Sequence, residues 1–132
     1  MSKLQWNDYE VIECLGLAPG IDDYDTGYHF TKENKGLRLD MSIWPFESLV
    51  VLSLFSAGLD RAVLTIWFVV RESLHHVHDK RGNYLRFANI VVVRPSRSYY
   101  LTQGDVFDNT KWPPSVDLIL MPDPFQIYFE NT

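Results

Sequence analysis

The chain has 132 residues, of which 46% are apolar, 17 are acidic, 12 are Lys or Arg and one is Cys. This length fits a single domain, residues 1–132, built around one hydrophobic core. One cysteine cannot form an intramolecular disulfide, no secretory signal pattern is visible, and the longest apolar run, Ala62–Val70, is too short to span a membrane. We therefore expect a cytoplasmic protein without a membrane span.

The formal net charge of −5 is unevenly distributed along the chain. Residues 1–60 hold ten acids and four bases, residues 61–100 hold two acids and seven bases, and residues 101–132 hold five acids and one base. Phosphate binding requires a basic surface, so the overall acidity argues against a nucleic-acid partner. The segregation indicates an acidic and a basic side, provided that the fold keeps these segments apart.

The first predicted element is a short helix over Asp8–Leu15. Asn7 is a suitable N-cap, Glu10 follows it three residues later, and Gly16 stands where a glycine would end the helix. Two helical turns are unstable alone in water, so this helix must pack against something larger.

After an acidic loop, Ile21–Asp25, the sequence pattern changes to that of β-strands. Residues 37–43 alternate strictly between apolar and polar, which predicts a half-buried antiparallel strand. Tyr28–Glu33 precedes this strand across a glycine-containing connection typical of a hairpin. Leu49–Phe55 and Ala62–Arg71 are the next predicted strands, and the second is predicted to be central because both of its faces are apolar.

The second half of the chain continues with strands and without helices. Arg71–Arg81 is polar and irregular, and we predict an exposed connection there. Further strands are predicted at Tyr84–Arg94, Ser98–Thr102, Val116–Met121 and Phe125–Glu130, with a surface connection over Gly104–Ser115. Because strand follows strand directly, the sheets should be antiparallel. The predicted fold is mainly β: an antiparallel β-sandwich or flattened barrel of about eight strands with one short N-terminal helix.

A core between two such layers would be filled by apolar residues from alternating strand positions. The predicted core consists of Leu39, Ile43, Leu52, Leu54, Leu64, Ile66, Phe68, Val91, Val93, Leu118, Leu120, Ile127 and Phe129.

The most suggestive group of metal-ligand residues is the run from His75 to Asp79. In an extended chain His76 and His78 project to the same face, where two imidazoles can share a metal. Zinc sites need three or four protein ligands, however, and no third ligand is identifiable from the sequence. We therefore predict no bound metal, with His76 and His78 as the candidate ligands if one binds.

The segment from Asp22 to Glu33 partly matches a calcium-binding loop. Asp22, Gly27 and Glu33 stand at positions 1, 6 and 12 of that pattern, but Tyr24 and Thr26 replace the expected oxygen ligands at positions 3 and 5. The run after Gly27 also has the pattern of a strand instead of an exiting helix. We interpret the segment as an ordinary acidic loop and predict no cofactor.

The sequence also lacks the local signatures of common enzymes. It contains no nucleophile elbow, phosphate-binding glycine loop or dinucleotide fingerprint, and Cys14 is interpreted as a structural thiol at the edge of the helix stripe. The general character of the chain, an acidic β-domain without a catalytic motif, resembles that of many small bacterial proteins that act by binding, immunity proteins against toxins among them. No residue motif links the chain to one named family.

We therefore predict that the protein binds another protein through a surface containing Asp22, Asp23, Asp25 and Trp44. Loops rich in charge carry recognition readily, and an aromatic residue nearby would supply a desolvated anchor. Three alternatives stay open: an acidic loop that only keeps the protein soluble, a small-ligand or carbohydrate-binding β-domain, and an enzyme with an unrecognised site.

Overall fold

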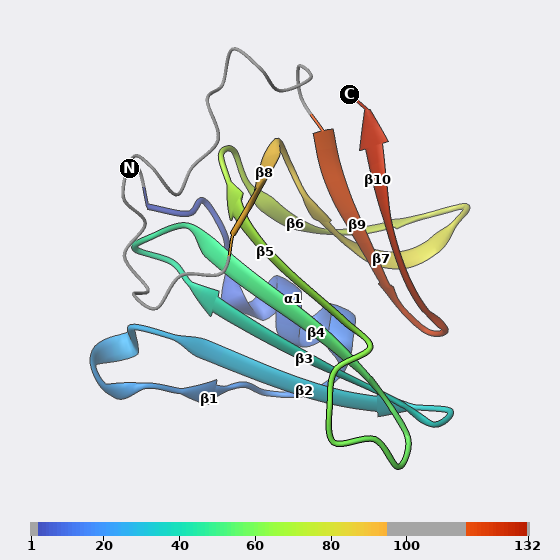
Figure 1. Cartoon of the computed structure of the whole chain (residues 1–132). Helices are drawn as coiled ribbons and strands as arrows, with labels where there is room; N and C mark the ends of the chain where they lie inside the picture. The colour runs from blue at the N-terminus through green and yellow to red at the C-terminus, as the bar shows by residue number, and fades with distance from the viewer. Residues whose placement is uncertain (1–2, 95–115, 132) are drawn as a thin grey trace.

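The computed structural model describes residues 3–94 and 116–131. Its elements, in chain order, are α1 (Asp8–Leu15), β1 (Gly20–Ile21), the 3₁₀ turn η1 (Asp23–Asp25), β2 (Tyr28–Asn34), β3 (Leu37–Trp44), β4 (Leu49–Ser56), β5 (Leu64–Val70), β6 (Leu74–Asp79), β7 (Gly82–Phe87), β8 (Ile90–Val93), β9 (Val116–Pro122) and β10 (Phe125–Asn131) (Figure 1). In the part of the chain that is described, no helix is both long enough and apolar enough to cross a membrane.

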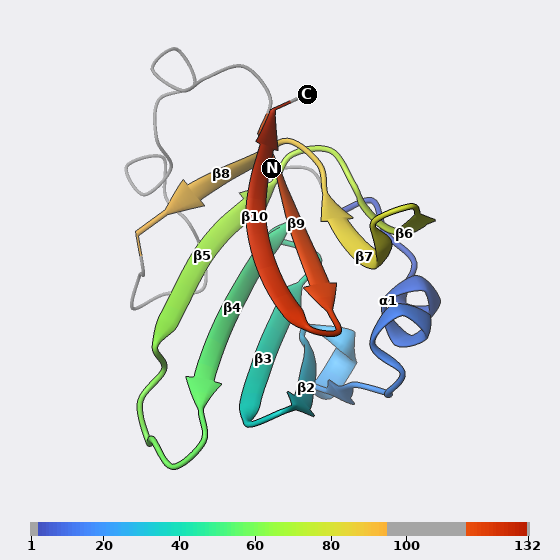
Figure 2. The ribbon, with the colours of Figure 1, turned by 90° about the vertical axis from the view of Figure 1, so that its right-hand side faces the viewer.

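The strands form two antiparallel sheets. One has six strands in the order β1-β2-β3-β4-β5-β8, and the other has four in the order β10-β9-β7-β6. Figures 1 and 2 show them as separate layers, with the chain passing between layers from β5 to β6 and from β7 to β8. Among the described strands the layers do not close into a barrel, so the predicted β-sandwich is confirmed.

The predicted helix has the predicted boundaries. The Asn7 side chain accepts a hydrogen bond from the Tyr9 amide at 2.9 Å, as an N-cap does. Gly16 ends the helix with φ 76°, a left-handed conformation that glycine adopts without steric cost. Its amide donates to the Ile12 carbonyl at 2.8 Å.

The predicted polar connection at Arg71–Arg81 is wrong, because this segment contains strand β6 and the turn into β7. β6 lies at the edge of the four-stranded sheet, where a strand tolerates polar residues on most of its positions. The predicted strand at Tyr84–Arg94 is instead two strands in different sheets, separated at Asn89, whose φ is 58°. The strand predicted at Ser98–Thr102 and the connection at Gly104–Ser115 lie outside the described residues.

The core lies between the two sheets, where apolar side chains from both inner faces meet. Phe68 of β5 and Phe87 of β7 pack edge to face, with ring centroids 5.2 Å apart. Six residues of the predicted core are confirmed there, namely Leu39, Ile43, Leu52, Phe68, Leu118 and Leu120. Val91 and Val93 are buried as well, but they belong to a separate cluster and not to this core. Leu54, Ile66 and Ile127 are only partly buried at its margin.

Two predicted core residues are wrong. Leu64 is 41% exposed, because the pairing of β5 with β8 covers only Trp67–Val70 and leaves the start of β5 beyond it. Phe129 is 52% exposed on β10, the edge strand of the four-stranded sheet. Alternation along the sequence indicates which face a residue takes, but not where the opposite layer ends.

A second, smaller apolar cluster explains why β5 is apolar on both faces. It consists of Leu49, Val69, Val91 and Val93, with Trp44 and Trp67 packed against them. These residues alternate with the core residues along their strands, so they lie on the opposite face of the six-stranded sheet.

Helix α1 closes one side of the sandwich and is bonded to both sheets. The last carbonyls of a helix have no partner within it. Here the carbonyl of Cys14 accepts from the Asn83 side chain on β7 at 3.0 Å, and the carbonyl of Leu15 accepts from the Lys32 ammonium on β2 at 2.7 Å. A two-turn helix is thereby held in a fixed position between β2 and the β6–β7 hairpin.

The difference between Phe68 and Leu64 gives a direct test of this layering. We expect Phe68→Ala to lower the free energy of unfolding by about 3–5 kcal/mol, because it removes a fully buried ring. Leu64→Ala should cost less than about 1 kcal/mol, since the side chain is partly in water already. Urea unfolding of both variants measures this, and equal losses would contradict the position of β5.

Candidate functional site

The three predicted acidic residues lie together on one exposed turn. Asp22 precedes η1, and Asp23 and Asp25 lie within it, between β1 and β2 at one end of the six-stranded sheet (Figure 1). The Asp22 amide donates to the Gly27 carbonyl at 2.9 Å, and the Asp25 amide donates to the Asp22 carbonyl at 3.1 Å. Backbone hydrogen bonds thus give the acidic turn a defined shape. The strand that follows Gly27 agrees with the interpretation that this is not a helix-flanked calcium loop.

His29 on β2 attaches this turn to the sheet. Its Nε2 lies 2.9 Å from Asp22 Oδ2, and its Nδ1 lies 2.8 Å from the hydroxyl oxygen of Ser42 on β3. The imidazole therefore links the turn to two strands at once. The Trp44 ring packs edge-on against the imidazole, with centroids 5.8 Å apart.

Trp44 is half-buried, and it lies against the turn. A Cβ atom added at Gly27 would lie 2.9 Å from Trp44 Nε1 and 2.5 Å from Asp22 Oδ2. The position therefore requires glycine for steric reasons, because the carboxylate and the indole both approach its Cα. The structure thus brings Trp44 together with Asp22, and a direct contact between Trp44 and a partner stays a prediction.

The aromatic residue of the acidic turn is Tyr24. From the sequence, it was considered only as a residue that does not fit the calcium-loop pattern. It is 94% exposed and lies between Asp23 and Asp25. Tyr24 has φ 61° and Asp25 has φ 56°, a left-handed conformation that is unfavourable for tyrosine. An aromatic residue within a run of acids in a predicted turn was the sequence signal that could have identified it.

A hollow of about 210 Å³ adjoins the turn, and its lining is mainly aromatic. We call it the aromatic hollow, and its residues are Lys3, Trp6, Tyr24, Asp25, Tyr28, Pro45 and Phe46. They come from the segment before α1, from η1, from β2 and from the β3–β4 turn, and Figure 1 shows the β1–β2 and β3–β4 turns at the same end of the sheet. Trp6 and Tyr28 pack edge to face at 4.9 Å.

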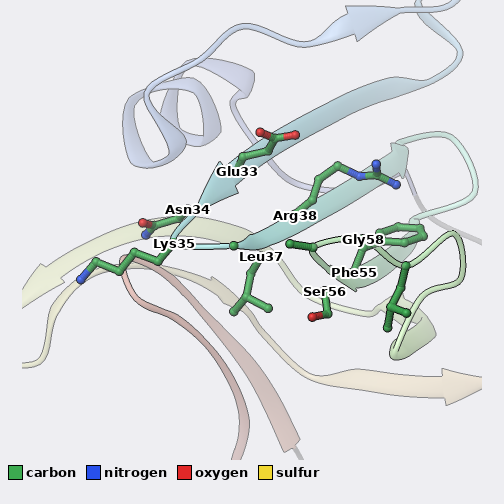
Figure 3. A pocket seen from close by; sticks show the side chains of 11 residues that line it. Glu33, Asn34, Lys35, Leu37, Arg38, Phe55, Ser56 and Gly58 are labelled. Carbon is green, nitrogen blue, oxygen red and sulfur yellow. The ribbon is translucent and has the colours of Figure 1, made fainter.

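A larger hollow, of about 360 Å³, lies at the opposite end of the six-stranded sheet, between the β2–β3 turn and the β4–β5 loop (Figure 3). The Arg38 guanidinium stacks on the Phe55 ring at 4.1 Å and its Nε lies 3.5 Å from Asp40 Oδ1. Figure 3 shows the Lys35 side chain pointing away from Arg38. The arginine of this hollow is therefore already engaged within the protein.

The two candidate metal ligands lie on β6. The His76 ring is hydrogen-bonded to the Asn83 side chain, and its amide donates to the Glu10 carboxylate at 3.2 Å, whereas His78 is exposed. Among residues 3–94 and 116–131, no three His, Cys, Asp or Glu side chains come together as a metal site would require. The absence of a bound metal stays a prediction, and His76 has a structural role next to α1.

Cys14 is buried on the inner side of α1. Burial raises the pKa of its thiol from 9.0 to about 12, so that the thiol is protonated at neutral pH. Because the thiolate is the nucleophile, this environment supports the interpretation of Cys14 as a structural residue.

A second charged cluster lies around Arg81, in the turn between β6 and β7. Arg81 donates to Glu130 of β10 at 2.7 Å, and its other terminal nitrogen lies 3.3 Å from Asp79. The Tyr84 hydroxyl donates to Asp79 at 2.6 Å. This hydrogen bond, followed by those from Arg81, lowers the pKa of Asp79 to about 2. Arg81 and its two acidic partners therefore neutralise one another, and they link the β6–β7 hairpin to β10.

The comparisons with known proteins identify a fold but no family. No family model and no curated protein sequence matches the chain. Among solved structures, the chain resembles a chain of a contact-dependent growth inhibition toxin–immunity protein complex from Klebsiella pneumoniae 342, with a TM-score of 0.66 over 98% of both chains. The two sequences are 15% identical, so the likeness establishes the shared fold alone.

The fit of Gly27 between Asp22 and Trp44 can be tested by a matched pair of variants. We expect Gly27→Ala to displace the Asp22 carboxylate from His29, because the new methyl group would collide with it. NMR signals of the His29 ring should shift strongly. Gly20→Ala is the control, since its Cβ would meet only the His29 carbonyl at 3.9 Å. Equal perturbation by both variants would contradict the described packing.

The low pKa of Asp79 makes its contribution to stability depend on pH. The folded-state pKa lies below the ordinary value of 3.8, so the carboxylate stabilises the protein above that value and loses its effect as pH falls toward about 2. We expect Asp79→Asn to be less stable than the parent protein at pH 6, with the gap narrowing between pH 4 and pH 2. Urea unfolding across this range measures the gap. A gap that is constant with pH would contradict the assignment.

Proposed function

We propose that this protein is an immunity-type inhibitor that binds a basic protein partner through its acidic-aromatic face. This face consists of Asp22, Asp23, Tyr24, Asp25 and Phe46. The observation that carries the proposal is Tyr24, which is 94% exposed between carboxylates on a turn that His29 fixes to the sheet.

The chemistry of this face suits protein recognition. Tyrosine offers a large contact area with few rotatable bonds, and it is frequent among the residues that dominate binding energy. The surrounding carboxylates would steer a cationic surface toward it and penalise acidic competitors. Because the turn is held by backbone hydrogen bonds and by His29, little further ordering is needed on binding.

The shared fold supports a toxin as the class of protein partner. The resembling chain, matched over 98% of its length, belongs to a complex of a toxin with an immunity protein. A cationic toxin domain would complement the acidic-aromatic face, and occupation of its basic surface would block access of an anionic substrate. Small-ligand binding in the hollow of Figure 3 has less support, because Arg38 there is already engaged by Phe55 and Asp40.

Affinity capture from the native cell, followed by calorimetry with the purified captured protein, tests this proposal. We expect Asp23→Asn/Asp25→Asn to weaken binding on the order of tenfold, or ~1.4 kcal/mol, and to reduce its salt dependence. Asparagine keeps the side-chain size and tolerates the left-handed backbone of residue 25.

The matched control is Glu13→Gln/Asp60→Asn, which removes the same charge from exposed positions on α1 and the β4–β5 loop. This control should keep the parental affinity. If both double variants bind alike, or if the captured protein is acidic, the proposal is wrong.

A further inference from the structure

We propose that the aromatic hollow is a receptor for a single arginine side chain of the protein partner. This inference rests on the proposed function and deepens it, since it assigns a chemical group to one part of the binding face.

The walls of the hollow have the composition that cations prefer. Four aromatic residues, Trp6, Tyr24, Tyr28 and Phe46, are among the seven that line this volume of about 210 Å³. Cations are attracted to the faces of such rings, and arginine also stacks on them through its planar guanidinium. The volume is below the roughly 300–1,000 Å³ typical of small-molecule sites, so it suits one side chain better than a separate ligand.

Two acids and one cation surround the hollow, so the charge of these three groups together is negative. Asp25 contributes to its lining, and Asp8 lies nearby in the first turn of α1. The pKa of the Tyr28 phenol is raised, first by burial and then by the negative charges of Asp25 and Asp8. The same potential that disfavours a phenolate at Tyr28 favours a cation.

The protein already places one of its own cations in the hollow. Lys3 lines it, with its ammonium nitrogen 4.9 Å from the centroid of the Phe46 ring. Lys3 thus occupies the position that the partner's group would take. A guanidinium is more weakly hydrated than an ammonium and stacks on aromatic faces, so an incoming arginine would compete well against this internal lysine.

The test uses the peptide acetyl-Gly-Arg-Gly-amide as the probe and its citrulline analogue as the uncharged control. Both are titrated into the 132-residue protein, and binding is followed by NMR. We expect the arginine peptide to shift the Trp6 indole N–H and the amides of Tyr24, Tyr28 and Phe46 in a saturable manner. The citrulline peptide should leave them unchanged.

Variants distinguish arginine binding in the hollow from general attraction of the peptide to the acidic surface. Phe46→Leu keeps an apolar side chain at this exposed position but removes the ring, and it should weaken arginine-peptide binding about two- to fivefold. Lys3→Gln should strengthen binding, because it removes the internal competitor. Lys35→Gln, which removes the same charge from the exposed β2–β3 turn, should leave the affinity unchanged.

Two results would overturn the inference: shifts that are equal for both peptides, or an arginine-peptide affinity that Phe46→Leu and Lys3→Gln leave unaltered. The proposed function is judged separately, by the response of the captured protein to Asp23→Asn/Asp25→Asn. The hollow can therefore fail its test while the acidic-aromatic face passes, and the reverse outcome is equally visible.

Discussion

The position of one short helix determines much of this structure. Each sheet donates one side-chain hydrogen bond to a carbonyl group that α1 leaves unpaired at its C-terminal end. Asn83 donates from one sheet and Lys32 from the other. An eight-residue helix has no independent stability, so these bonds and its buried apolar stripe hold it in place. The chain segment that enters the helix is fixed with it, since the Leu4 amide donates to the Pro45 carbonyl at 2.8 Å. Trp6 therefore packs against Tyr28, and both residues line the aromatic hollow.

Charged residues serve two different purposes in this protein. Around Arg81, carboxylates, a phenol and a guanidinium form a closed network that joins three strands, and the lowered pKa of Asp79 reflects that mutual satisfaction. At η1, three acids lie on an exposed turn beside Tyr24. His29 is hydrogen-bonded to Asp22, the residue that precedes η1. The first arrangement is typical of structural stabilisation. The second concentrates one sign of charge toward solvent, which favours recognition over stability.

Local signals in the sequence predicted much of the fold. The caps of α1 and the strict alternation over residues 37–43 each depend on neighbouring residues, and both predictions hold. The errors at β6, Leu64 and Phe129 have a common origin, because each depends on where a sheet ends, which no local pattern encodes. The acidic turn was visible because its residues are adjacent in sequence. The aromatic hollow was not, because four separate segments of the chain contribute to it.

The conformation of η1 restricts the backbone at position 24 more than the side chain there. Tyr24 and Asp25 adopt left-handed backbone geometry, whereas the Tyr24 side chain lies almost wholly in solvent. Folding therefore restricts the backbone of position 24 but places little demand on its side chain. Asn or Asp would fit there readily, whereas a β-branched residue would be disfavoured. A substitution at position 24 can therefore change the side chain offered to the proposed partner while the hydrogen bonds that shape the turn are kept.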